Sequence, residues 1–350
     1  ADESVSPGVP VQRGGKVQRV SLKGLVEDWW REAKASGRKP STFESYRHGF
    51  QGLSAYLKHD DAARVTPADI VAYKDHRLTA PNAKTGRVAS AKTVKDSDLA
   101  AFKTVFGWAV ANRKLESNPA LGITLKVGRA PRLRSKGFTQ EEAAAILAHA
   151  LAYARGGQEQ AKTAAAKRWV PWLMAFTGAR VGELAQLRRQ DVTRHGEHWV
   201  VRITPEAGTV KTNQARAVVL HEQLVELGFP AFVQDSREGH LFLTPADDGD
   251  VLGPLQGVKN RLAEFAREAV SDPQVAPNHG WRHRFKTVGR EVGIDHRTLD
   301  AIQGHAPRSD GEDYGDVTLP VIAAAIRRLP RYEVGRDAAL VARRSSPVAT

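Results

Sequence analysis

In the first third of the chain, apolar residues recur at helical spacing, and this pattern limits the fold more than any other sequence feature. Four runs follow one another, beginning after Ser21, after Pro40, at Thr66 and at about Ala91. Ser21 and Thr66 can cap their helices, and Ser41 or Thr42 is the expected cap of the second. The last run ends near Asn112. We therefore predict a compact module of four helices.

The remaining sequence is also mostly helical in pattern. A capping box from Thr139 to Glu142 opens it. Helices are predicted at about 254–270, 279–292, 296–303 and 320–329. Only residues 198–220 alternate like a strand, on either side of a turn-rich stretch, and they predict a β-hairpin or the edge of a small sheet. The fold class is therefore mainly α with a small β-sheet or hairpin, in the α+β class.

Length and local composition divide the chain. A chain of 350 residues with 41% hydrophobic residues suits two domains. Residues 1–17 and 336–350 show no apolar period, so we expect both ends to be disordered. Between them we predict a helical domain over 18–120, a basic linker over 121–137 and a second domain over 138–335.

Positive charge is concentrated near the N-terminus. The net charge is +13, and residues 1–136 hold 25 Lys and Arg against 13 Asp and Glu. This imbalance predicts an anionic polymer as partner, although a solvated charged surface is the alternative. The residues predicted to contact DNA are Lys92, Lys95, Lys103, Lys126, Arg129, Arg132, Arg134, Lys136 and Arg216.

Several classes of protein are excluded by composition. The chain has no cysteine, which excludes disulfides, cysteine zinc sites and thiol nucleophiles. No signal peptide or long apolar run is found, so a soluble, cytoplasmic and nucleoid-associated protein is expected. Position 1 is Ala and the only methionine is Met174, so we expect a processed or trimmed N-terminus, and an upstream arm-binding domain is left open. Val210 stands where a P-loop has Gly, and we expect no cofactor and no metal.

Five segments supply residue types that a phosphodiester exchange needs. They contain Arg180 with Glu183; Lys211; His279, Arg282 and His283; His305; and Tyr314. Arg180 lies in an apolar stretch that we expect to be helical, with Glu183 on the same face. Four of the segments also have a plainer interpretation: a surface ion pair, a solvated hairpin lysine, a basic helix or a zinc pair at His279 and His283, and a core tyrosine.

Taken in order, these residues resemble the active-site series of the tyrosine recombinases, the phage integrase family. The resemblance spans about 138–335 and includes GAR-x-x-EL, K-T-x-x-x-R and a GH followed by Tyr at nine positions. Residues 108–119 also resemble the family's core-binding domain, and Gly280-Trp281 departs from its usual pattern. The resemblance implies a two-domain clamp around DNA, with a core-binding and a catalytic domain.

The resemblance also implies a role for each residue. Tyr314 would be the nucleophile that forms a 3′-phosphotyrosyl bond, while Arg180, Arg282 and His305 would bind the phosphate. His279 would be the base and Lys211 the acid, with Glu183 and His283 in support.

The implied partner is double-stranded DNA with a specific core site. A homotetramer would act on this DNA, with room for accessory DNA-bending or directionality proteins. Its task is left open between integration, excision, transposon mobility and resolution of chromosome dimers. Residues 320–340 would pack on a neighbouring subunit, or equally form an intramolecular lid. The competing functions are a type IB topoisomerase and a DNA-binding protein without catalytic activity.

Overall fold

The computed structural model describes residues 20–82, 85–128, 131, 133–210, 212–306 and 315–334. The expectations for both chain ends, for Arg129, Arg132 and Lys211, and for Tyr314 lie outside these residues. The chain divides into two compact units, residues 1–131 and 132–350, so the division falls within the stretch expected to be the linker. Each unit has its own apolar core.

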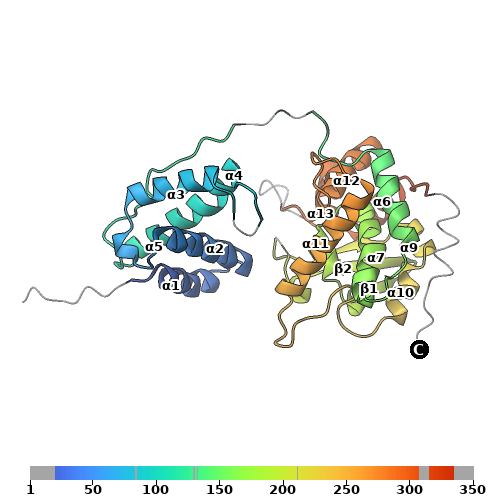
Figure 1. The fold of residues 1–350 in the computed structure, drawn as a ribbon. Coiled ribbons are helices and arrows are strands. Elements are labelled where there is room, and N and C mark those ends of the chain that lie inside the picture. The colour runs from blue at the N-terminus through green and yellow to red at the C-terminus, as the bar shows by residue number, and fades with distance from the viewer. Residues whose placement is uncertain are drawn as a thin grey trace, which may run out of the picture. The chain divides into compact units, whose positions relative to one another are not determined.

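The regular elements of the first unit's described part are all helices (Figure 1). Its elements are α1 (Leu22–Ala35), α2 (Pro40–Leu57), a 3-10 turn (Ala62–Arg64), α3 (Pro67–Thr79), α4 (Ala91–Thr93) and α5 (Ala100–Ala111). A π-helical segment, Val94–Leu99, joins α4 to α5, so the single helix predicted over 91–112 is continuous but changes its winding. Helical periodicity in the sequence does not distinguish an α-turn from a single π-turn.

Caps and aromatic packing fix this unit. The Ser21 hydroxyl accepts the amide of Gly24 at 2.7 Å, and Thr66 forms a complete capping box with Asp69. The cap expected at Ser41 or Thr42 is wrong, because α2 already begins at Pro40, where a proline loses no helical hydrogen bond. Phe50, Phe102 and Phe106 pack together in the core, with ring centroids 5.2 to 6.4 Å apart.

The second unit combines helices with one small sheet (Figure 1). Its helices are α6 (Gln140–Ala152), α7 (Ala161–Thr177), α8 (Val181–Ala185), α9 (Glu222–Glu226), α10 (Phe229–Asp235), α11 (Leu252–Ala269), α12 (Gly280–Glu291), α13 (His296–Gln303) and α15 (Leu319–Arg327). Short 3-10 turns lie at Arg189–Asp191 and Pro205–Ala207. The helix α7 contacts α6, α11 and α12, and its segment from Trp169 to Thr177 is buried.

The sheet has three antiparallel strands in the order β1-β2-β3. They are β1 (Val192–His195), β2 (His198–Ile203) and β3 (Arg216–Val219). The sequence predicted the second and third strands but missed β1, where only Val192 is buried and the next three residues are exposed. Val201 pairs with Val218 at the centre of the β2–β3 ladder. This pairing sets Arg216, the first residue of β3, opposite Ile203.

The helix α15 packs on its own chain. Ile322, Ile326 and Leu329 join the core of the second unit, and α15 contacts β3 and α13. Beyond the helix, the carbonyl of Tyr332 accepts a hydrogen bond from Gln223 at 2.8 Å. Residues 319–334 therefore pack on the second unit of their own chain, packing on a neighbouring subunit stays a prediction, and residues 335–340 lie outside the described residues. No helix within the described ranges is long and apolar enough to cross a membrane.

The Gly280-Trp281 departure from the family pattern has a packing explanation. Trp281 is fully buried, with its ring centroid 5.1 Å from that of Phe138 in an edge-on contact and 6.4 Å from that of Tyr332. A Cβ atom at Gly280 would lie 2.8 Å from the Phe138 ring, so a glycine is needed beside the tryptophan. The pair thus fixes α12 against the start of the second unit.

We expect Trp281→Ala to destabilise the second unit by about 3–5 kcal/mol, because truncating a buried tryptophan leaves a large cavity. For a unit of this size the melting temperature should fall by about 6–20 °C. Calorimetry of the full chain measures this fall. Trp281→Phe is the matched control: it keeps a ring against Phe138 and removes a buried indole N–H that has no partner among the described residues. Equal melting of the Ala variant and the wild type would contradict this role.

Candidate active site

Arg180 lies in a turn, not in a helix as the sequence suggested. The helix α7 ends at Thr177, and Gly178 adopts the left-handed conformation with φ of 57°. A side chain at Gly178 would collide with Gln303 and Phe285, at 2.6 and 2.7 Å. Only glycine fits this reversal, which sets Arg180 at the N-cap of the next helix, α8.

Glu183 is the acid that fixes Arg180. Its carboxylate accepts the Arg180 guanidinium at 2.8 Å and the Arg180 backbone amide at 3.2 Å. The Glu183 side chain is only 2% exposed. Burial alone would raise the pKa of Glu183, but the charges and hydrogen bonds of Arg216 and Arg180 outweigh burial and lower it. The carboxylate is therefore ionised, and the pair is not the surface ion pair considered as the plainer interpretation.

Arg216 shares this carboxylate. Its Nη2 donates to Glu183 at 2.6 Å, and its Nε donates to the carbonyl of Ile302 at 3.0 Å. The Arg216 side chain is 11% exposed, so the structure places it within the site and not on an open DNA-contacting surface. The guanidinium also lies against Gly304, where an added Cβ would come within 2.4 Å of Nη1.

Arg282 is the most deeply buried of the three arginines. It lies on α12, and its Nη1 donates to the carbonyls of Gly178 and Gln303 at 2.8 and 2.7 Å. Burial and the neighbouring charge of Arg180 lower its pKa to about 10, so it stays protonated at neutral pH. Among the described residues no carboxylate forms an ion pair with it, and its buried Nη2 has no hydrogen-bond partner. A buried donor without a partner among the described residues is costly, so this Nη2 is available to donate to an acceptor from outside the chain.

The three arginines converge on the C-terminal end of α13. Arg216, Arg282 and Arg180 donate to three consecutive carbonyls, those of Ile302, Gln303 and Gly304. The last carbonyls of a helix have no partner within it and carry a partial negative charge. We call Arg180, Arg216, Arg282 and Glu183 the arginine cluster. It carries two more positive charges than negative ones.

The two predicted histidines of α12 lie next to each other. His279 is the N-cap of α12, and its ring meets that of His283 edge-on, with centroids 4.9 Å apart. His279 is exposed at the surface, yet partial desolvation by the surrounding protein and the charges of His283, Arg282, Arg180 and Lys136 lower its pKa to about 4. It is therefore neutral at pH 7. Zinc binding at this pair would need further ligands, and the described chain contains no group of three or more candidate ligands.

His305 is held by an acid that sequence reasoning missed. Its Nδ1 lies 2.6 Å from a carboxylate oxygen of Asp300, and Lys286 donates to the same oxygen. Asp300 precedes His305 by five residues and Lys286 lies on α12, so no local spacing in the sequence links them. The only sequence signal was an acid and a lysine on two neighbouring predicted helices.

The predicted DNA-contacting lysines are placed as follows. Lys92, Lys95, Lys126 and Lys136 are exposed, and Lys103 is half-buried. Lys92 forms an ion pair with Asp96. Arg134 differs from the lysines, because Glu142 and Asp272 both accept its guanidinium, at 2.6 Å each. Its charge is already balanced within the second unit. Contact of these residues with DNA stays a prediction.

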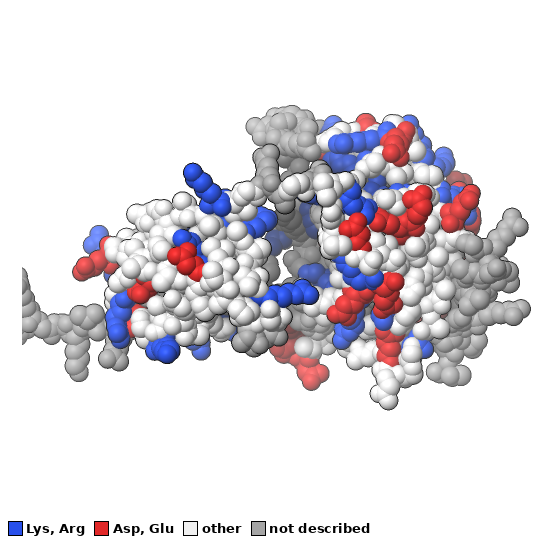
Figure 2. Space-filling view, turned by 45° about the horizontal axis from the view of Figure 1, so that its top comes forward, with Lys and Arg blue, Asp and Glu red and all other residues white. Residues whose placement is uncertain are grey.

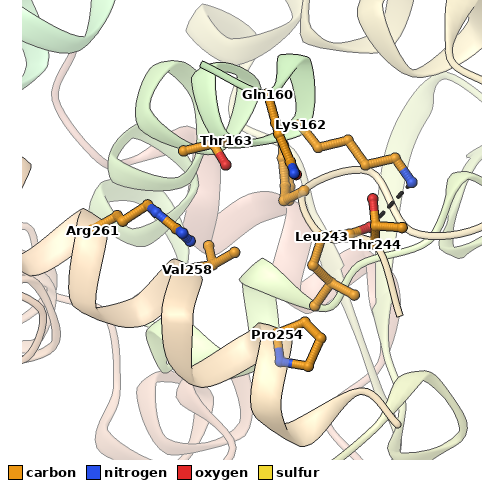
Figure 3. A pocket seen from close by; sticks show the side chains of 9 residues that line it. Gln160, Lys162, Thr163, Leu243, Thr244, Pro254, Val258 and Arg261 are labelled. Carbon is orange, nitrogen blue, oxygen red and sulfur yellow. Dashed lines mark hydrogen bonds between the residues drawn. The ribbon is translucent and has the colours of Figure 1, made fainter. Parts of the chain in front are cut away.

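A pocket of about 320 Å³ lies apart from these residues (Figure 3). Lys162 and Thr163 line it from the first turn of α7, and Arg261 lines it from α11. Arg180 follows the opposite end of α7, and a 17-residue helix is about 25 Å long. The pocket is therefore not part of the arginine cluster.

Comparisons with known proteins identify the family and the fold of the chain. The sequence matches the model of the phage integrase family over residues 136–318, slightly more than half of the chain. No curated protein matches it. The XerH site-specific recombinase bound to its difH substrate, in a pre-cleavage complex, has a similar structure: TM-score 0.54, 16% identity, covering 83% of this chain and 80% of that chain.

Two further structures are similar. A lambda integrase dimer bound to a COC′ core site has a TM-score of 0.53 and 16% identity, covering 85% of this chain and 99% of that chain. The Tn1549 transposon integrase, in complex with a circular intermediate DNA, has a TM-score of 0.50 and 18% identity, covering 87% and 99%. At such identities the likeness establishes the fold, a mostly helical chain with one small antiparallel sheet. Because the family model covers more than half of the sequence and spans every residue from Arg180 to Tyr314, the chain belongs to the phage integrase family.

Proposed function

We propose that this protein is a site-specific DNA recombinase that cleaves and rejoins DNA strands through a covalent 3′-phosphotyrosyl bond to Tyr314. The observation that carries the proposal is the excess positive charge of the arginine cluster around one carboxylate, Glu183. A phosphodiester gains negative charge on its non-bridging oxygens during substitution, and guanidinium groups match phosphate in geometry and charge. The buried Nη2 of Arg282 is a donor ready for such an oxygen.

In this mechanism the phenol oxygen of Tyr314 forms a bond to phosphorus, and the bond from phosphorus to the 5′ oxygen breaks. Arg180 and Arg282 stabilise the charge on the phosphate oxygens. His279 accepts the phenol proton, for which its neutral form at pH 7 is the competent one. Lys211 gives a proton to the departing 5′ oxygen. The phosphotyrosyl bond conserves the energy of the broken bond, so rejoining needs no nucleotide cofactor.

The partner that we propose is double-stranded DNA with a specific core site, bound in a clamp of both units. The exposed lysines of the first unit would contact its phosphates. A homotetramer on DNA is the proposed assembly, and a lambda integrase tetramer bound to a Holliday junction, 16% identical with a TM-score of 0.53, supports it. We place the protein in the cytoplasm, at the nucleoid.

We expect Tyr314→Phe to abolish covalent DNA–protein adducts while binding remains within about twofold, because only the nucleophilic oxygen is lost. The full chain is incubated in EDTA with DNA that flanks its gene, quenched with detergent, and the protein-linked DNA is sequenced. Tyr56→Phe, in the first unit, is the matched control and should keep the adducts. Adducts at wild-type level in Tyr314→Phe would sink the nucleophile assignment.

We expect Glu183→Gln to slow adduct formation by about a hundredfold or more, because Arg180 and Arg216 lose the carboxylate that orients both. The variant should also lose about 3–5 kcal/mol of unfolding free energy, since it leaves two partly buried guanidiniums without an acid.

The control for this change is Glu222→Gln, which removes an exposed acid paired with Arg331 and should cost less than about 1 kcal/mol. Single-turnover adduct formation and thermal melting measure the two effects. If Glu183→Gln has the same melting temperature and the same rate of adduct formation as Glu222→Gln, Glu183 does not orient the arginines.

A further inference from the structure

Asp300 is a nearly buried acid surrounded by basic groups. It lies on α13 and is 9% exposed. One carboxylate oxygen accepts a hydrogen bond from the Lys286 ammonium and lies 2.6 Å from Nδ1 of His305. The other oxygen lies 3.1 Å from Nδ1 of His296. None of the family motifs quoted above includes Asp300 or Lys286, so the resemblance assigned neither a role.

The contact between Asp300 and His305 determines which ring nitrogen carries a proton. Burial raises the pKa of Asp300, but the hydrogen bonds and charges of Lys286 and His305 outweigh it and lower the pKa. An ionised carboxylate can only accept hydrogen bonds, so Nδ1 of His305 must carry the hydrogen between them. The other ring nitrogen, Nε2, makes no hydrogen bond to Asp300.

The backbone fixes this pair. Gly304 turns the chain in the left-handed conformation after α13, and the amide of His305 donates back to the carbonyl of Asp300 at 2.9 Å. Arg180 holds the carbonyl of Gly304 itself. His305 is therefore tied to Asp300 by a main-chain and a side-chain contact, directly beside the arginine cluster.

Charges of both signs surround His305. Arg282 and Lys286 come from α12, Asp300 and His296 from α13, Arg216 from β3, and Arg180 with Glu183 from α8 and its cap. Burial, followed by the charge of Arg282, lowers the pKa of His305, while Asp300 acts against both. Among the described residues, Asp300 is thus a negative group in direct contact with the His305 ring.

We propose that Asp300 is a positioning residue for DNA cleavage: its carboxylate orients the His305 ring through Nδ1 and directs Nε2 to the scissile phosphate, while Lys286 holds that carboxylate in place. The proposal rests on the proposed function in one respect, the role of His305 at the phosphate. The tautomer and the orientation follow from the contacts alone.

One chemical consequence follows. With Nδ1–H committed to Asp300, a neutral ring has only a lone pair at Nε2, which would repel a phosphate oxygen. His305 can donate to the phosphate only as the imidazolium ion, with a proton on each nitrogen. Asp300 stabilises this ion against the charge of Arg282, and Lys286, which shares the same oxygen, weakens that stabilisation. Neutralising Asp300 and neutralising Lys286 should therefore change the pKa of His305 in opposite directions.

The test measures His305 without DNA. The full chain is labelled with ¹⁵N-histidine, and His305 is assigned among the twelve histidines by its loss in His305→Gln. In the wild type at high pH we expect the hydrogen on Nδ1. In Asp300→Asn the measured pKa of His305 should fall by about 1 or more, because an opposite charge in contact is lost. In Lys286→Gln it should rise.

The matched control is Asp235→Asn, which removes an exposed acid at the end of α10 and should leave the titration of His305 unchanged. A purely structural role for Asp300 would not give opposite shifts in the two variants. An unchanged titration in Asp300→Asn, a hydrogen on Nε2 in the wild type, or shifts of the same sign would each overturn the proposal.

The second measurement concerns the reaction. Once the junction DNA from the adduct experiment is known, Asp300→Asn should form adducts about tenfold to a hundredfold more slowly than wild type. Its loss should grow as the pH rises, because less of its His305 is protonated. A loss that is the same at every pH would contradict the proposal. Absence of adducts in the wild type would instead contradict the proposed function. The NMR titration would still test the contact between Asp300 and His305, because it needs no DNA.

Discussion

The C-terminal end of α13 holds the arginines that the rest of the site depends on. Carbonyls at a helix end need donors from elsewhere, and here the carbonyls of Ile302, Gln303 and Gly304 each accept an arginine from a different element. The guanidiniums are positively charged and would repel one another without this partly negative helix end and Glu183. Gly178 and Gly304 make the approach possible, because a side chain at either position would collide with the groups that meet there.

This arrangement explains why the site can be positive without being unstable. Glu183 balances one of three arginine charges, and Asp300 balances Lys286. The remaining excess is held by backbone carbonyls, which stabilise a guanidinium without neutralising it. A phosphate oxygen that reached the buried Nη2 of Arg282 would supply the acceptor it lacks among the described residues. Water could accept this hydrogen bond as well, but the excess positive charge of the arginine cluster favours an anion.

Much of this could be predicted from the sequence, and the limits have physical causes. Helical periodicity located most helices of both units, but the π-turn before α5 and the one-sided strand β1 leave no clear period. Motif order singled out Arg180, Arg282 and His305 as candidates, and the structure brings them together. The sequence placed Arg180 inside a helix because the left-handed Gly178 was not foreseen. Asp300 was not singled out from the sequence, because its contacts with Lys286 and His305 depend on how α12 packs on α13 and not on any local spacing.

The net positive charge of the chain is distributed unevenly between its two parts. Residues 1–136 carry nearly all of the net charge, whereas the remaining 214 residues are almost balanced, and blue and red side chains intermix on the face of the second unit in Figure 2. A balanced surface contributes little to long-range attraction of DNA, so that attraction has to come from the first unit and the linker lysines. The second unit nevertheless holds a local excess of positive charge at the arginine cluster. In the proposed function this excess lies at the reacting phosphate, and stabilisation of the charge that develops there is what accelerates the reaction.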